Sequence, residues 1–175
     1  MIYGFPPIAG PDARVLVLGS VPSVRSLAAG QYYAHPQNAF WTIMAQLFAW
    51  ESGLDYATRT ALLLRTRIAL WDVLQAAERP GSLDSAIVAG SERANDFAGF
   101  FVAHPAIHSV FFNGTKAEAL FLRHVVQQGA LTATLRFHRL PSTSPAHAGR
   151  SRAEKLAAWQ VLADAVSATG DQAHP

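Results

Sequence analysis

The chain has 175 residues, half of them hydrophobic and only 15% charged, which favours one globular domain with a full core and excludes a disordered chain. No apolar run approaches the roughly 20 residues that a membrane-spanning helix needs. The formal net charge at pH 7 is only +2, so the overall charge does not by itself indicate a nucleic-acid-binding protein.

The N-terminus and the lack of cysteine bear on the cellular compartment. Residues 1–7 contain neither a basic region nor a long apolar core, so we expect no signal peptide. The absence of cysteine excludes disulfides and thiolate metal sites. Together these features predict a cytoplasmic protein.

Four short runs are typical of buried strands, namely residues 15–18, 68–71, 109–112 and 134–137. The first three are almost continuously apolar, as in parallel strands that are covered on both faces. The fourth run alternates with Arg136 and His138, which predicts an edge strand.

Helical patterns lie between and after these runs, over residues 40–48, 56–64, 94–102 and 116–126. The last helix is the best marked, because Ser151 and Glu154 have the spacing of a capping box and apolar residues line one face behind them. Strands that alternate with helices predict a parallel sheet with right-handed crossovers.

No linker or repeat divides the chain. Residues 79–82 have the composition of a surface turn and are too few to separate two domains. We therefore expect a single domain over residues 1–168, followed by a flexible tail over residues 169–175.

The first loop with chemical interest, residues 19–26, follows the first strand. It offers small and hydroxyl residues, namely Gly19, Ser20, Pro22, Ser23 and Ser26. Small residues let a backbone approach a ligand, and hydroxyls bind phosphate or a base edge. The loop is not a P-loop, because it lacks the second glycine and the lysine-serine/threonine pair. A plain strand-to-helix turn is the alternative.

The second segment, residues 33–41, is more specific. Tyr33 provides a ring that can stack on a flat heterocycle, and Asn38 provides a carboxamide with both a donor and an acceptor. Asn38 can instead be the N-cap of the helix that follows, and His35 with Pro36 can be a rigid turn.

Polar residues also end the later strands. Trp71 and Asp72 end the second strand, and Asn113 with Gly114 ends the third, so these groups are expected to meet in one crevice. Capping and ordinary turn chemistry are the alternatives. A further polar loop, residues 141–147, follows the fourth strand. The basic residues expected around that loop are Arg136, His138, Arg139, His147, Arg150, Arg152 and Lys155. Such a rim can guide a polyanion, although a solvated surface is the more common explanation of a charge cluster.

The histidines show no metal-ligand spacing with a carboxylate partner, and no glycine-x-serine-x-glycine nucleophile elbow is present. We therefore expect neither a metal nor a cofactor.

Taken in order, residues 19–23, 33–41, 113–114 and 140–147 resemble the uracil-DNA glycosylase superfamily, and within it the hypoxanthine-DNA (DNA-deoxyinosine) glycosylases. The resemblance spans roughly residues 1–165, and residues 35–41 are its most specific part. It implies an α/β fold, a three-layer α/β/α sandwich around a four-stranded parallel sheet. It also implies a monofunctional enzyme that hydrolyses the N-glycosidic bond of deaminated bases, chiefly hypoxanthine, in base excision repair.

Residue chemistry and resemblance together predict the site. Asn38 matches the catalytic asparagine of the hypoxanthine branch. The residues expected to bind the base are Gly19, Ser20, Pro22, Tyr33, Trp71, Asp72 and Asn113. Those expected to bind DNA are Ser23, Ser26, His35, Ser142, Thr143, Ser144, Pro145 and His147. The expected partner is DNA that contains a deaminated base, with no membrane partner, and the expected state is a monomer.

Two positions depart from the resembling uracil glycosylases. Val21 stands where those enzymes carry an aspartate or asparagine, and Ser142 stands where many carry a histidine that stabilises the departing uracil oxygen. Efficient uracil excision is therefore not expected, and Asn38 remains the main catalytic candidate. The alternative functions are a hydrolase or binding protein for free purine nucleosides or nucleotides, and a non-catalytic sensor of DNA damage.

Overall fold

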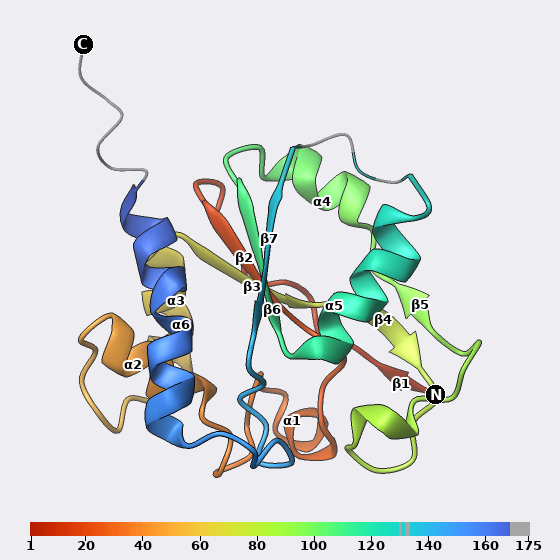
Figure 1. The fold of residues 1–175 in the computed structure, drawn as a ribbon, viewed down its shortest axis with the longest axis horizontal. Helices are drawn as coiled ribbons and strands as arrows, with labels where there is room; N and C mark the ends of the chain where they lie inside the picture. The colour runs from red at the N-terminus through yellow and green to blue at the C-terminus, as the bar shows by residue number, and fades with distance from the viewer. Residues whose placement is uncertain (130, 132–133, 169–175) are drawn as a thin grey trace.

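The computed structural model describes residues 1–129, 131 and 134–168. Its centre is a four-stranded parallel sheet, in the order β3 (Ile68–Asp72), β2 (Val15–Gly19), β6 (Ser109–Asn113) and β7 (Arg136–Leu140) (Figure 1). The predicted parallel sheet is confirmed, and its carboxyl ends lie together because Gly19 is in register with Asp72 and Asn113 with Leu140.

The burial of each strand follows its sequence. Every residue of β2 and β3 is buried, whereas β7 is mostly exposed and lies at one edge, as its alternating pattern predicted. The strand begins two residues later than predicted, because its pairing with β6 starts at Arg136 opposite Ser109. Thr134 and Leu135 precede that pair and have no strand partner in the described sheet.

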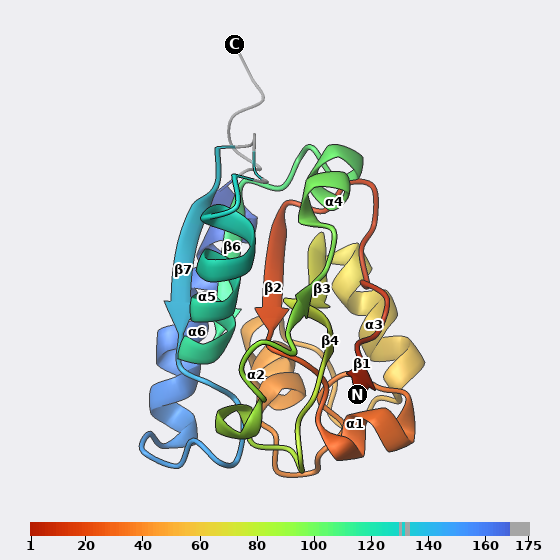
Figure 2. The ribbon, with the colours of Figure 1, turned by 90° about the vertical axis from the view of Figure 1, so that its right-hand side faces the viewer.

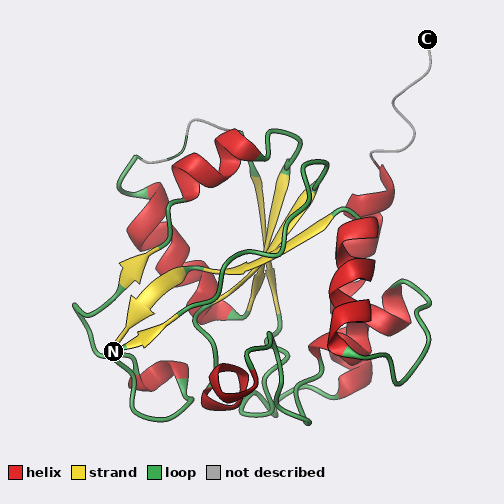
Figure 3. Ribbon diagram, turned by 180° about the vertical axis from the view of Figure 1, so that it is seen from behind, coloured by secondary structure: helices red, strands yellow, loops and turns green. Residues whose placement is uncertain are grey.

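Two hydrophobic clusters cover the two faces of the sheet. Val15, Val17 and Phe111 point to one cluster, and Leu16 and Phe112 point to the other, because successive strand residues face opposite sides. Helices α2 (Phe40–Leu47), α3 (Tyr56–Arg65) and α6 (Arg152–Ser167) cover the first face, and α4 (Phe97–Ala103) and α5 (Thr115–Phe121) cover the second (Figure 1). Seen from behind, helices flank the strands on both sides, so the three-layer α/β/α sandwich is confirmed (Figure 3).

Helix boundaries reflect local capping. The capping box of α6 is confirmed, with the Ser151 amide donating to the Glu154 carboxylate at 2.6 Å and the Glu154 amide donating to the Ser151 hydroxyl at 3.2 Å. Helix α4 begins three residues later than predicted, because the Asp96 side chain accepts from the Gly99 amide and fixes the first turn there. Helix α5 continues into a π-helical turn at Leu122–Val126.

A second, antiparallel sheet was not predicted. It has the order β1 (Ile2–Tyr3), β4 (Leu74–Ala77) and β5 (Arg93–Ala94), and β4 follows β3 after a single residue. Its strands contain only two to four residues each, too few to show a period in the sequence. Also new are α1 (Val24–Ala29) and a short 3₁₀ helix at Asp84–Ala86.

The arrowheads of β2 and β7 point to the lower edge of Figure 2, where the loops after the strands, α1 and the 3₁₀ helix are gathered. Within the described part of the chain, no helix is both long and apolar enough to cross a membrane.

Candidate active site

A cavity of about 900 Å³ opens at the carboxyl ends of the parallel strands. Polar and aromatic residues from five loops line it, as expected for the ligand site of a parallel α/β sheet. Every predicted site residue except Trp71 lies on its wall: Gly19, Ser20, Pro22, Ser23, Ser26, Tyr33, His35, Asn38, Asp72, Asn113, Ser142, Thr143, Ser144, Pro145 and His147.

The base-binding role predicted for Trp71 needs correction. Trp71 and Asp72 are neighbours on β3, so their side chains point to opposite faces of the pleated strand. The Trp71 ring packs against Phe97 and Phe100 at centroid distances of 5.1 and 5.0 Å, and its Nε1 donates to the Phe5 carbonyl at 3.0 Å. Trp71 therefore belongs to the core beneath the second face of the sheet.

Gly19 and Asp72 form the floor of the cavity. A Cβ atom at position 19 would overlap the Asp72 Oδ1 atom and lie 3.1 Å from the Tyr33 hydroxyl, so glycine is needed for this close approach. Asp72 is only 4% exposed. Burial, and then the nearby Asp84 carboxylate, raise the pKa of Asp72 to about 7, against an opposing effect of Arg79.

Tyr33 is fixed above this floor in an unusual backbone conformation. Its φ angle is +53°, in the left-handed region that a non-glycine residue enters at a cost of roughly 1–2 kcal/mol. Its ring stacks on Phe40 with centroids 4.2 Å apart and planes 29° apart. Burial, followed by the charge of Asp72, raises the pKa of the hydroxyl, so Tyr33 is a neutral group at the base of the cavity.

Asn38 lies on the cavity wall just before α2 and is half-buried. Its Oδ1 accepts from the Phe40 amide at 3.0 Å, so the carboxamide does help to start the helix, as the capping alternative held. Its Nδ2 makes no hydrogen bond to any residue that the structure describes. The helix contact therefore orients the carboxamide and leaves its donor group unused.

Two predicted DNA contacts are turned inward. Ser26 and Thr143 are 3% and 1% exposed. The Ser26 hydroxyl accepts from the Ala34 amide at 3.3 Å, and Thr143 is bound by the Asn113 carboxamide. Both residues hold loops in place, and so they can influence DNA only through the loops that they hold.

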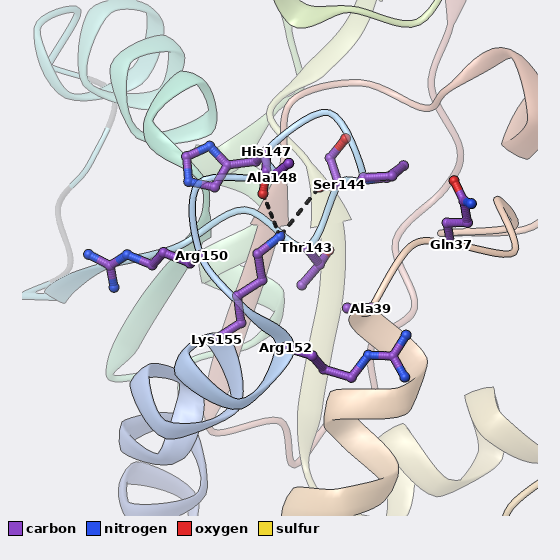
Figure 4. Close-up of a pocket in the computed structure, with 10 residues that line it drawn as sticks. Gln37, Ala39, Thr143, Ser144, His147, Ala148, Arg150, Arg152 and Lys155 are labelled. Carbon is purple, nitrogen blue, oxygen red and sulfur yellow. Dashed lines mark hydrogen bonds between the residues drawn. The ribbon is translucent and has the colours of Figure 1, made fainter.

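The loop after β7 folds around a buried lysine. Lys155, from the first turns of α6, is 6% exposed and donates to the carbonyls of His147 at 2.8 Å and Ser144 at 3.4 Å (Figure 4). A smaller cavity of about 240 Å³ lies here, and Arg150 and Arg152 also line it. Burial lowers the pKa of Lys155, which acts as an internal clamp.

The predicted basic rim is therefore smaller than expected. Arg139, His147 and Arg150 do line the main cavity. Arg136 starts β7, at the opposite end of the strand from the loop, and the His138 ring is stacked on Phe111 at 4.5 Å. How close a strand residue lies to the loop depends on where the strand begins and ends. The pattern of charges in the sequence did not reveal those bounds.

The sequence also missed Arg79 and Asp84. Arg79 belongs to the turn at residues 79–82, yet its guanidinium is almost completely buried and donates to the carbonyls of Pro22 at 2.6 Å and Gly81 at 2.9 Å. Asp84 lies 3.9 Å from this guanidinium and accepts from the Ser20 hydroxyl at 2.6 Å. These contacts lock the first loop to the turn, and a proline-glycine turn carries no sequence signal for them.

No group of three or more histidine, aspartate or glutamate side chains suited to a metal occurs among the described residues.

The fold and the cavity together define an α/β enzyme whose substrate enters at the carboxyl edge of a parallel sheet. The sequence model of the "Uracil DNA glycosylase superfamily" matches residues 6–163. The chain belongs to this superfamily, and it is a DNA glycosylase.

Individual relatives agree with this assignment. The chain is 38% identical, over 115 residues, to a hypoxanthine DNA glycosylase of Methanosarcina acetivorans and 36% identical to one of Methanosarcina barkeri; each alignment covers 65% of this chain and 72% of the relative. A solution NMR structure of a Methanosarcina acetivorans protein, assigned to the uracil DNA glycosylases, superposes with a TM-score of 0.72 at 32% identity. That superposition covers 91% of this chain and 97% of the other.

Proposed function

We propose that this protein removes deaminated bases, chiefly hypoxanthine, from DNA by hydrolysing the N-glycosidic bond in base excision repair. The observation that carries the proposal is the position of Asn38, whose unused amide donor lies on the wall of a cavity of about 900 Å³. The relatives named as hypoxanthine DNA glycosylases support the choice of base.

The base must leave the duplex to reach this cavity. Extrusion costs a few kcal/mol and is easiest for a mispaired base. Pro145, Ala146 and His147 are exposed at the tip of the loop after β7, where a compact wedge can fill the vacated stack. The hydroxyls of Ser23, Ser142 and Ser144, with the His35 ring, line the rim and are suited to phosphate contacts.

Within the cavity, the extruded base packs beside the Tyr33 ring and the small residues Gly19, Ser20 and Pro22. Asn113 shares this wall, and its carboxamide holds Thr143.

Asn38 acts in this scheme without titrating, since a carboxamide has no useful proton equilibrium. If the glycosidic bond breaks before water attacks, the sugar becomes oxocarbenium-like and the water needs little activation. The Asn38 carboxamide then orients this water or stabilises developing charge. Removal of one such preorganised group costs about 10²–10³ in rate where electrostatics dominate.

The test compares excision from oligonucleotides that carry hypoxanthine, xanthine or uracil, followed by alkali to cut the abasic sites. Asn38→Ala is expected to bind DNA and to lose excision. Asn38→Ser is the matched control for folding, because a serine hydroxyl can still accept from the Phe40 amide but cannot replace the carboxamide donor. We expect both variants to fold and neither to excise.

Wild-type cleavage by Asn38→Ala would refute the role of Asn38. Activity on free deoxyinosine but not on DNA would contradict the proposed substrate, and tight binding to inosine-containing DNA without base release would contradict the proposed activity. Borohydride trapping of a covalent protein–DNA adduct would contradict a monofunctional mechanism, because it reports a Schiff base.

A further inference from the structure

The Asp72 carboxyl group is buried at the floor of the cavity without a counter-ion. Its Oδ2 atom has no hydrogen-bond partner in the part of the chain that the structure describes. An isolated ionised carboxylate is very costly to bury, so a group in this position becomes neutral instead. The Asp72 side chain nonetheless lines the cavity.

The charged and titratable neighbours do not neutralise Asp72. They are Tyr32 and Tyr33 from the segment before α2, Arg79 from the turn after β4, Asp84 from the 3₁₀ helix and, through its effect on Asp84, Lys116. The two tyrosines have raised pKa values and remain neutral. Asp84 adds a like charge, which disfavours ionisation of Asp72 further.

Arg79 is the cation that affects the pKa of Asp72, but its N–H groups bind other partners. Its guanidinium binds the carbonyls of Val21, Pro22 and Gly81 and faces Asp84 at 3.9 Å. Among the described residues, no ion pair joins its guanidinium to Asp72. Arg79 therefore lowers the pKa of Asp72 from a distance without forming a salt bridge to it.

The end of β2 comes close to this carboxyl without covering it with a side chain, because a Cβ atom at Gly19 would overlap the Asp72 Oδ1 atom. Asp72 therefore lines the floor of the cavity directly, with its Oδ2 atom lacking a hydrogen-bond partner among the described residues. A buried polar group without a partner beside a cavity indicates that a polar ligand supplies the missing hydrogen bond.

We propose that Asp72 recognises the extruded base as a neutral carboxylic acid, donating its O–H to the base and accepting a ring N–H in return. This inference rests on the proposed function. Hypoxanthine, xanthine and uracil each carry a carbonyl next to a ring N–H, and a carboxylic acid pairs with both groups at once. A carboxylate has no proton for the carbonyl oxygen.

The same proton assists departure of the base. When the bond between C1′ and the base nitrogen breaks, its electron pair leaves with the base, which becomes an anion while the sugar becomes cationic. Water then adds its oxygen to C1′, and its proton neutralises the base. The Asp72 O–H donates to the base throughout and keeps its proton, whereas an ionised Asp72 would repel the departing anion.

The experiment is a pH profile of single-turnover excision from a hypoxanthine-containing oligonucleotide, for the wild type and for Asp72→Asn. The wild-type rate is expected to fall as pH rises through about 7, the pKa of Asp72. At pH 9 only about 1% of a group with that pKa remains protonated, so a loss of about 100-fold from pH 5 is expected. Asp72→Asn keeps a donor and an acceptor but cannot ionise, so its rate, even where it is lower than that of the wild type at pH 5, should not fall through pH 7.

Two further measurements separate the possible failures. Asp72→Leu keeps the branching of the side chain, with methyl groups in place of both oxygens, and should excise poorly at every pH. The histidines that line the cavity stay in all variants and so cannot explain a difference between them. A wild-type rate that is flat or rises through pH 7, or a folded but inactive Asp72→Asn, would overturn the inference.

If the wild type excised no deaminated base at any pH, the proposed function itself would fail. The ¹³C NMR titration of the Asp72 carboxyl, assigned by its absence in Asp72→Asn, then decides the protonation state independently. A midpoint near pH 7 supports the neutral acid, and one below about 5, in the ordinary aspartate range, contradicts it.

Discussion

Asn113 and Thr143 hold each other through two reciprocal hydrogen bonds, although 30 residues separate them in the chain. The Asn113 Nδ2 donates to the Thr143 hydroxyl and the Thr143 amide donates to the Asn113 Oδ1, each at 2.9 Å. The Thr143 carbonyl in turn accepts from the Ala39 amide at 3.0 Å. This chain of bonds joins the end of β6, the loop after β7 and the residue next to Asn38.

Replacement of Asn113 by alanine is expected to lower the free energy of unfolding by about 1–3 kcal/mol, because it leaves the buried Thr143 amide without its acceptor. Excision should slow as well, since the loop after β7 is no longer held in place beside Asn38. Thr143→Ser retains both bonds and is the matched control. Denaturant unfolding and single-turnover excision measure the two effects; an Asn113→Ala enzyme as stable and active as Thr143→Ser would contradict this prediction.

Gly19→Ala tests the close approach at the cavity floor. The added Cβ would overlap Asp72 Oδ1 and crowd the Tyr33 hydroxyl, so we expect a folded protein with strongly reduced excision. Gly10→Ala is the control, because its Cβ would be in ordinary contact with Leu64 at 3.8 Å and in tight contact only with the exposed Asp12 carboxylate at 3.1 Å, which can move aside. Rates measured at saturating enzyme compare the two variants, and equal rates would show that the floor tolerates a methyl group.

Lys155→Met tests the clamp under the loop after β7. Loss of the ammonium leaves the carbonyls of Ser144 and His147 without this donor, at a cost of about 1–3 kcal/mol, and should weaken DNA binding by loosening the loop. Arg152→Met removes the same charge from an exposed neighbour without disturbing these carbonyls. Fluorescence anisotropy measures the DNA affinity of both variants at two salt concentrations, because a loss of charge alone depends on salt. Equal losses of affinity in the two variants would argue against the clamp.

Asp72 should also make stability depend on pH. Its pKa is raised to about 7 in the folded protein from 3.8, so the folded state holds the proton more tightly, and stability is expected to fall as pH rises between these values. Asp72→Asn removes this effect and should be more stable than the wild type at pH 8 by up to about 4 kcal/mol, with the difference narrowing at pH 5. Thermal unfolding at the two pH values measures it, and an Asp72→Asn protein that is the less stable at pH 8 would refute the prediction.

The prediction of the site from sequence succeeded where the signal was local. The polar residues after β2, β3 and β6 were placed in one crevice because parallel strands align their carboxyl ends, and the structure brings them to one cavity. It did not succeed for Trp71, because a pleat turns neighbours to opposite faces and the sequence did not say which face carries the cavity. Arg79 was missed because its partner Pro22 lies on another loop and Asp84 in the 3₁₀ helix that follows the turn, which the sequence did not predict.

The sequence by itself determined the buried strands, the capped α6 and the position of Asn38 before a helix, because each depends on contacts within a few residues. Only the tertiary structure decided that Gly19 lets the end of β2 come close to Asp72, that Arg79 and Lys155 are buried, and that Asn113 binds Thr143. These relationships join residues up to 58 positions apart, and strand register and loop closure, which no local pattern encodes, bring them together.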